Sequence, residues 1–219
     1  MTTHHLESET ILRLAGGSLD PVLALVARTH IACCPECGGA LAALEDAGGV
    51  FLDDIAPEPV SATLRERALA ALDTAPETPA TPAQRPIALQ PGTVPAPLDA
   101  MIGDDLSAVR WRSIAPGVAK HDLPTPKGSR GRLFLLKIAP GKRVPEHGHG
   151  GTELTMVLSG SYSDHLGCFG PGDVADLDAD LEHRPHVDPG APCISVVASE
   201  TPVRFKGLIG RLLQPVLGI

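Results

Sequence analysis

Three residues near the start of the chain have the types and the spacing of metal ligands. His30, Cys34 and Cys37 form the pattern H-x3-C-x2-C, so an imidazole and two thiols lie within eight residues. If a helix continues as far as Cys34, His30 and Cys34 face the same side, because residues four apart are neighbours on a helix. A fourth ligand from His4 or His5 would complete a tetrahedral shell of two histidines and two cysteines, which is typical of structural zinc.

The position of the cysteines also favours thiolates. Pro35 suits the first position of a helix, which would place Cys34 at the N-cap and Cys37 in the first turn. The positive end of a helix dipole lowers the pKa of a nearby thiol, and a metal binds the thiolate. Two other interpretations stay open. One is a buried cysteine pair beside a core histidine, and the other is a redox dithiol, although here the C-x2-C lies between helices.

A second group of candidate ligands lies in the C-terminal half. Gly141 precedes His147, His149 and Glu153, and Gly160 follows, in a spacing that resembles the first sequence motif of cupins, G-x5-H-x-H-x3-E-x6-G. On a strand, residues two apart point to the same side, and the Gly-Gly turn after His149 brings Glu153 back beside the two imidazoles. Two imidazoles and a carboxylate on one face favour a divalent transition metal.

The second motif of a cupin is incomplete. Residues 170–173 supply its Gly-Pro-Gly-Asp turn, but the chain contains no asparagine, so the usual Asn after the histidine is absent. His183 is the best candidate for the fourth ligand, because imidazole is the commonest side-chain metal donor. His186 is its rival, and either histidine could instead lie on a polar surface loop.

The first group of ligands requires helices to position it. Apolar residues at helical spacing end at Gly16 and Gly17. Asp20 and Pro21 then provide an N-cap and a first helical residue for the next helix. We expect the four helices to form one compact bundle. They are predicted at residues 10–15, 22–32, 35–44 (ending near Gly48 and Gly49) and 61–72.

A proline-rich stretch divides the chain. Residues 74–97 contain seven prolines and few large apolar residues, a composition that favours an extended linker without a core. After it the hydrophobic period changes to two, which indicates a sandwich or barrel. The predicted fold class is α+β with two domains: a helical zinc-binding bundle at residues 1–73 and a cupin β-barrel of the jelly-roll type at residues 98–219. The strand predictions cover residues 131–138, 154–158, 174–177 and 194–198.

Charge and composition narrow the function. Residues 1–73 carry four arginines, no lysine and eleven acidic residues. This balance is unsuited to neutralising DNA phosphates but suits a basic protein partner, although solubility charge alone would look the same. No apolar run approaches the ~20 residues that span a bilayer, and the first residues lack a secretory-signal pattern. Five cysteines are a poor disulfide framework, so we expect a cytoplasmic protein.

Residues 1–73 resemble the zinc-binding anti-sigma domain, and nearly the whole chain resembles the ChrR-type anti-sigma factors. The shared segments are LAGGSL near residue 15, the H-x3-C-x2-C pattern, HGHGGTEL from residue 147 and the later LEH. The resemblance implies binding and inhibition of an extracytoplasmic-function sigma factor in a one-to-one complex. Release is then expected under oxidative stress such as singlet oxygen. The zinc ligands it implies are His5, His30, Cys34 and Cys37, with His4 as the fallback for His5.

The predicted architecture also suggests a mechanism, which we state as a hypothesis. Helices locked by zinc would present an apolar surface with an acidic rim to the sigma factor and block its contacts with RNA polymerase core. The cupin would act as the sensor, through oxidation at its metal shell or at Cys168, Cys193 or Met156. Its metal, which we expect to be Zn²⁺, would be bound by His147, His149, Glu153 and His183.

Two other functions fit parts of the sequence. A cupin dioxygenase or isomerase would use iron, manganese or nickel at the same four cupin ligands, because this fold supports many chemistries. The sequence shows no evident acid and base residues beyond those ligands. A DNA-binding repressor with a cupin sensor is the third hypothesis, and the acidic charge of residues 1–73 opposes it.

Overall fold

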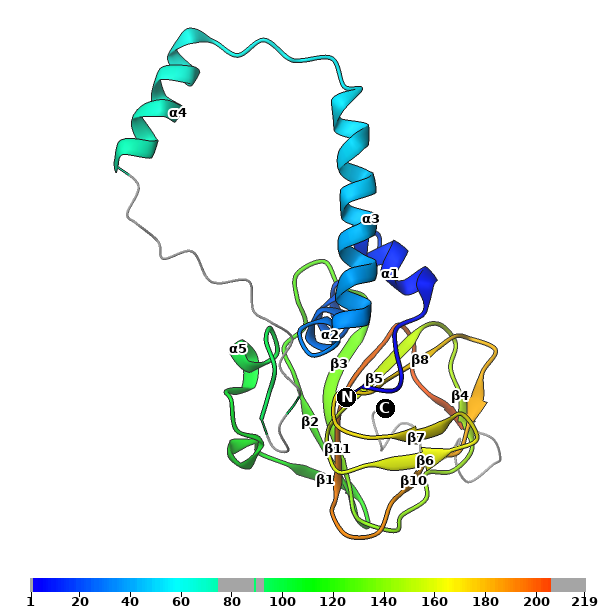
Figure 1. The fold of residues 1–219 in the computed structure, drawn as a ribbon. Coiled ribbons are helices and arrows are strands. Elements are labelled where there is room, and N and C mark those ends of the chain that lie inside the picture. The colour runs from blue at the N-terminus through cyan, green and yellow to red at the C-terminus, as the bar shows by residue number, and fades with distance from the viewer. Residues whose placement is uncertain (1, 75–88, 90–92, 206–219) are drawn as a thin grey trace.

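The structure is a computed structural model, and it describes residues 2–74, 89 and 93–205. Three helices stand against one side of a β-barrel; the third projects far beyond it, and a fourth helix lies apart from the body (Figure 1). Among the described residues, no helix combines the length and the apolar character needed to cross a membrane. The predicted fold class, a helical N-terminal part followed by a cupin barrel, is confirmed.

Local signals start the second and third helices at the predicted prolines, whereas the first helix begins two residues before the predicted residue 10. Helix α1 covers Ser8–Ala15. Helix α2 (Pro21–Ile31) begins where the Asp20 carboxylate accepts a hydrogen bond from the backbone N–H of Val22 at 3.0 Å. Helix α3 (Pro35–Asp53) begins with its proline at the first position.

Two expectations about the helices were wrong. Helix α3 continues through Gly48 and Gly49 to Asp53, because neither glycine adopts the left-handed conformation that ends a helix. Helix α4 (Ala62–Thr74) does not complete a compact bundle. Every side chain from residue 45 to residue 73 is exposed, so neither α4 nor the second half of α3 buries an apolar face.

The described residues of the β part form three antiparallel sheets. The four predicted strands are all present in the largest sheet, as β3 (Arg132–Ile138), β5 (Glu153–Ser159), β8 (Val174–Leu177) and β11 (Cys193–Ser199). A short helix, α5 (Asp99–Ile102), and a 3-10 turn at Leu106–Ala108 precede the strands. The strands are β1 Arg112–Ala115, β2 Val118–Asp122, β3 Arg132–Ile138, β4 His147–Gly148, β5 Glu153–Ser159, β6 Tyr162–Asp164, β7 Gly167–Phe169, β8 Val174–Leu177, β9 Glu182–His183, β10 His186–Val187, β11 Cys193–Ser199 and β12 Arg204–Phe205. Their orders are β1-β2-β3-β11-β5-β8, β10-β6-β7 and β12-β4-β9.

The helices and the barrel share one apolar core. Val22 and Val26 of α2 are fully buried in the same cluster as Leu154 of β5 and Val196 of β11. A Cβ atom added to Gly131 would lie 2.5 Å from Val22 Cγ2, so the close approach of α2 to the sheet requires glycine there. Helix α2 is thus fixed to the barrel.

Most of the predicted linker cannot be compared with the structure. Residues 75–88 and 90–92 lie outside the described residues. The chain already belongs to the body of the protein just before residue 98, because Thr93 pairs with Asp105 and the Val94 side chain is buried.

Candidate metal centres

The H-x3-C-x2-C residues meet a histidine from the start of the chain. The ligand atoms of this first cluster, which consists of His5, His30, Cys34 and Cys37, all lie within 4.8 Å of one another. His30 is in the last turn of α2, Cys34 is the N-cap of α3, and Cys37 is in its first turn. Since α2 ends at Ile31, a tight turn rather than the expected continuous helix brings Cys34 beside His30.

Polar contacts leave one ring nitrogen of each histidine in the first cluster for a cation. Nδ1 of His30 lies 2.8 Å from the carbonyl oxygen of Gly172, which can only accept, so this nitrogen carries the proton. Nε2 of His30 is buried without a hydrogen-bond partner. Nε2 of His5 lies 3.2 Å from a Glu36 carboxylate oxygen, which leaves Nδ1 facing Cys34 Sγ at 3.2 Å. Zinc is bound through such lone pairs, so these residues fit it.

The pKa values of the two thiols of the first cluster are shifted in opposite directions. Burial acts to raise the pKa of Cys34, but hydrogen bonds from the backbone of Cys37 and from Thr2 outweigh it and lower that pKa. Burial raises the pKa of Cys37 to about 12, although the backbone N–H of Leu6 donates to its sulfur at 3.4 Å. The expectation that the helix start lowers the pKa of both thiols is therefore wrong for Cys37. A bound cation would stabilise the second thiolate.

His4 and Cys33 lie outside the first cluster. The His4 ring stacks on Phe169 with the ring centroids 4.0 Å apart, and its Nδ1 lies 3.8 Å from the Asp173 carboxylate. Cys33 is buried, and burial together with the neighbouring Cys34 raises its pKa to about 11. The geometry favours His5 over its fallback His4.

Three histidines of the barrel form a second cluster. The ligand atoms of His147, His149 and His183 lie within 4.8 Å of one another, and all three side chains are buried. Strands β4 and β9 pair so that His147 is opposite His183, and His149 follows β4 directly. His186 lies in β10 opposite Ser163, outside this cluster, so the geometry favours His183 over its rival.

Two of these imidazoles face each other across a gap that suits a cation. Nδ1 of His147 lies 2.8 Å from the carbonyl oxygen of Pro145, and Nδ1 of His183 lies 2.9 Å from the Asp164 carboxylate, so both Nδ1 atoms carry protons. The two Nε2 atoms are 2.9 Å apart. Burial, assisted by His183, lowers the pKa of His147 to about 4, so this ring is neutral near neutral pH. Two unprotonated nitrogens at this distance would repel each other, and a metal ion bound by both would remove that repulsion.

Glu153 borders the second cluster. Its Oε2 lies 3.2 Å from Nδ1 of His149, and the Thr155 hydroxyl donates to its Oε1 at 3.2 Å. Burial acts to raise the pKa of Glu153, but the adjacent His149 and the other two histidines outweigh it and lower that pKa. The carboxylate is therefore anionic next to the histidines, although it is not one of the three residues whose ligand atoms share a centre.

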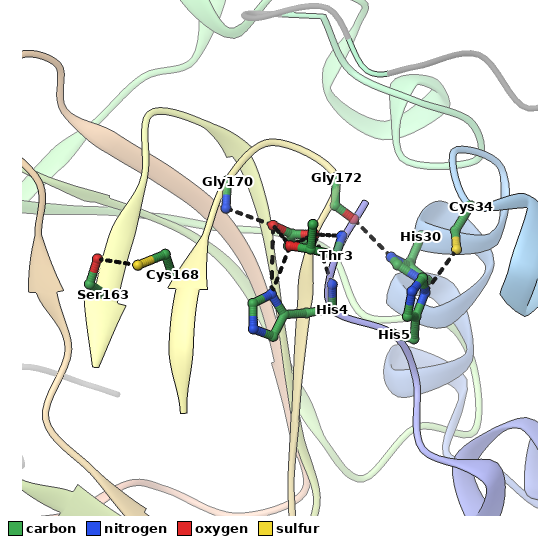
Figure 2. A network of polar contacts seen from close by, with 10 residues as sticks. Thr3, His4, His5, His30, Cys34, Ser163, Cys168, Gly170 and Gly172 are labelled. Atoms are coloured by element: carbon green, nitrogen blue, oxygen red, sulfur yellow. Dashed lines mark hydrogen bonds and ion pairs between the residues drawn. The ribbon is translucent and has the colours of Figure 1, made fainter. Parts of the chain in front are cut away.

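The sequence did not reveal the residues that orient these ligands. Gly172 and Asp164 each accept a hydrogen bond from a ligand histidine. The Glu36 carboxylate lies against the ring of His5. Figure 2 shows how the turn that contains Gly172 reaches His30. Glu36 is next to Cys37 in the sequence, but Gly172 is 142 positions from His30, so no local pattern could have indicated that contact.

Fold and site together define a cupin protein with an added helical part and two candidate metal centres. Residues 99–201 match the family described as ChrR Cupin-like domain. The anti-sigma-E factor ChrR of Cereibacter sphaeroides is 37% identical over 216 residues, which cover 99% of this chain and 98% of that protein. The chain belongs to the ChrR family of anti-sigma factors. A crystal structure of Rhodobacter sphaeroides SigE in complex with the anti-sigma factor ChrR is also similar, with a TM-score of 0.76 and 34% identity over 91% of this chain and 100% of that one.

Proposed function

We propose that this protein binds and inhibits a sigma factor of the extracytoplasmic-function class in a one-to-one complex. The observation that carries the proposal is an exposed apolar surface on α3 and α4, in a chain that is similar over its full length to ChrR, a protein solved in complex with SigE. Since this relative is a regulator rather than an enzyme, the hypothesis of a cupin oxygenase is not retained.

The docking surface consists of the large apolar side chains between residues 50 and 72. Their exposed fractions range from 49% to 73%. Isolated exposed apolar residues are normal, but so many in one continuous segment mark an interaction site. Figure 1 shows that α3 and α4 project away from the body, where a partner can reach them. The residues are Val50, Phe51, Leu52, Ile55, Val60, Leu64, Leu69 and Leu72.

The charge around the docking surface supports a basic partner. Residues 45–73 contain seven acidic residues and only two basic ones, Arg65 and Arg67. A sigma factor must bind nucleic acid, and the basic surface that this requires is complementary to an acidic rim. Apolar side chains would supply affinity, and the rim would supply orientation and association rate.

Zinc in the first cluster would set the direction of the docking surface. From residue 45 onward α3 is exposed, so its orientation depends on its first turns. Cys34 and Cys37 lie in those turns, and zinc would tie them to His30 of α2 and to His5. Structural zinc contributes folding free energy in small domains. Loss of the metal would therefore misdirect α3 and release the partner.

The second cluster would bind a divalent metal, which we propose is Zn²⁺, and would sense the releasing signal in the cytoplasm. Three imidazoles with a carboxylate beside them suit a divalent transition metal. Cys193 lines an apolar cavity of about 70 Å³ that also borders His147 and His183. Oxidation of Cys193 or of the metal shell would alter this cavity. Of the other two candidate oxidation sites, Cys168 is exposed to solvent, whereas Met156 is fully buried.

Binding and inhibition are tested with purified components. The zinc-loaded protein is mixed with each extracytoplasmic-function sigma factor of the same genome, and complex formation is followed by size-exclusion chromatography and by transcription from a cognate promoter. We expect one sigma factor to form a stable complex and to lose activity. Failure of every such sigma factor to bind would contradict the proposed function.

A further inference from the structure

The first cluster is completed by a turn of the barrel. The loop between β7 and β8 turns at residues 170–173, and the carbonyl oxygen of Gly172 accepts the Nδ1 proton of His30 at 2.8 Å. Figure 2 shows this turn reaching across to α2. The bond fixes which nitrogen of His30 carries the proton and leaves the buried Nε2 as the donor for a metal.

The next residue of the same turn holds the segment that carries His5. The carboxylate of Asp173, a residue that is only 5% exposed, accepts hydrogen bonds from the backbone N–H groups of Thr3 at 2.6 Å and His4 at 3.0 Å. The hydroxyl of Thr3 also donates to it, at 3.2 Å. Because His5 follows directly in the chain, this carboxylate fixes the backbone from which its imidazole projects.

Asp173 also shapes the turn itself. Its other carboxylate oxygen accepts the backbone N–H of Gly170 at 2.9 Å, and its own N–H donates to the Gly170 carbonyl at 3.0 Å. One buried carboxylate therefore ties the start of the chain to the turn that orients His30. Charge-assisted hydrogen bonds of this kind are shorter and stronger than neutral ones.

We propose that Gly172 and Asp173 are positioning residues of the zinc site, so that the barrel sets the zinc affinity of the helical part. The inference rests on the proposed zinc site and adds the route by which the cupin controls it. By linkage, zinc in the first cluster stabilises this turn to the same extent as the turn stabilises zinc binding. A displacement of the turn weakens the site by moving His5 and His30 together.

The test measures metal affinity at the first cluster in the full-length protein. Co²⁺ bound to thiolates gives a near-ultraviolet charge-transfer band, and only the first cluster contains cysteine ligands. Titration with Co²⁺, followed by competition with Zn²⁺, therefore reports this site separately from the histidines of the barrel. Total bound metal shows whether the second cluster is still loaded, which is a readout of an intact barrel.

Two variants alter the turn, and each has a matched control. Asp173→Asn places an amide NH₂ against either the Gly170 N–H or the N–H groups of Thr3 and His4. Asp188→Asn is its control, because Asp188 accepts hydrogen bonds from Ser161 and Ser163 within the barrel.

The second variant changes a glycine of the turn. Gly172→Ala introduces a Cβ that would lie 2.9 Å from Thr2 Cγ2, at a glycine with φ +95°. Gly190→Ala is its control, because Gly190 has φ +114° and open space around it, so it carries the same kind of backbone strain away from the first cluster.

We expect Asp173→Asn and Gly172→Ala to weaken metal binding at the first cluster by about 10–100-fold, the usual effect of removing a group that orients a ligand. Both controls should keep the affinity of the unaltered protein, and all four should keep metal in the second cluster. Unchanged affinity in both turn variants, or an equal loss in the controls, would overturn the inference. Absence of the thiolate band from the unaltered protein would instead refute the proposed zinc site.

Discussion

The Asp164 carboxylate lies 2.9 Å from Nδ1 of His183, and this contact orients the imidazole toward His147. Both side chains of the pair are buried. We predict that Asp164→Asn lowers metal affinity at the second cluster by about 10–100-fold, because an amide holds the ring less firmly and lowers its basicity. Competition with a chromophoric chelator measures the affinity. The thiolate band of the first cluster provides the internal control, and an unaltered affinity of the second cluster would show that Asp164 does not orient a ligand.

A charge placed in the docking surface should prevent capture of the sigma factor. Phe51 is 73% exposed, so Phe51→Glu should leave the free energy of unfolding within about 0.5 kcal/mol of its original value. If Phe51 enters the interface, the same change should weaken sigma-factor binding by roughly tenfold or more. Leu12→Glu is the matched control, because Leu12 is 58% exposed on α1, away from the docking surface. Equal binding by both variants would place the interface elsewhere.

Removal of zinc should loosen only part of the helical region. Helix α2 is held on the sheet by Val22 and Val26, whereas α3 depends on the first cluster for its direction. We therefore predict that a chelator, or Cys34→Ser, releases the sigma factor while most of the circular dichroism signal stays. Complete unfolding on metal loss would show that the shared core contributes less than we infer.

Asp20 should contribute to stability in a pH-dependent way. Burial acts to raise its pKa, but hydrogen bonds from Ser129, Arg130 and Val22 outweigh it and lower that pKa. A lowered pKa in the folded state means that the contribution is complete above the pKa of the unfolded chain and is lost as the pH falls through the folded value. Asp20→Ala should cost about 1–2 kcal/mol near neutral pH and less in acid, as measured by urea unfolding.

The control for Asp20 is another carboxylate that caps a local turn. Asp105 accepts a hydrogen bond from the backbone of Ser107 at 2.8 Å, but its side chain reaches no second element through that bond. Asp105→Ala should therefore cost less than Asp20→Ala. If the two variants lose the same free energy of unfolding, the contacts of Asp20 with residues 129 and 130 add nothing to the stability that its helix cap provides.

The candidate metal ligands could be predicted from the sequence, but the residues that orient them could not. His30, Cys34 and Cys37 were predictable because their spacing is local, and His147 and His149 because they are only two residues apart, at strand β4 and directly after it. The bond from His30 to Gly172 was not predictable, since it joins residues 142 positions apart. The length of α3 was misjudged because two adjacent glycines usually end a helix, and only the backbone conformation shows that here they do not.

The sequence also gave no indication that the helical part packs on the barrel. The change from helical to strand periodicity and the prolines at residues 74–97 indicated two domains. In the structure, α2 buries its apolar face against β5 and β11. Periodicity shows that a helix has an apolar face, but not which surface covers it.

The most direct measurement is the quantification of zinc and of bound sigma factor in one sample of the protein, purified from its native host before and after treatment with a chelator. We predict zinc in the two-histidine, two-cysteine cluster, one sigma factor per chain, and loss of both together. Sigma factor that stays bound after this zinc has been removed would contradict the claim that the metal holds the docking surface in place.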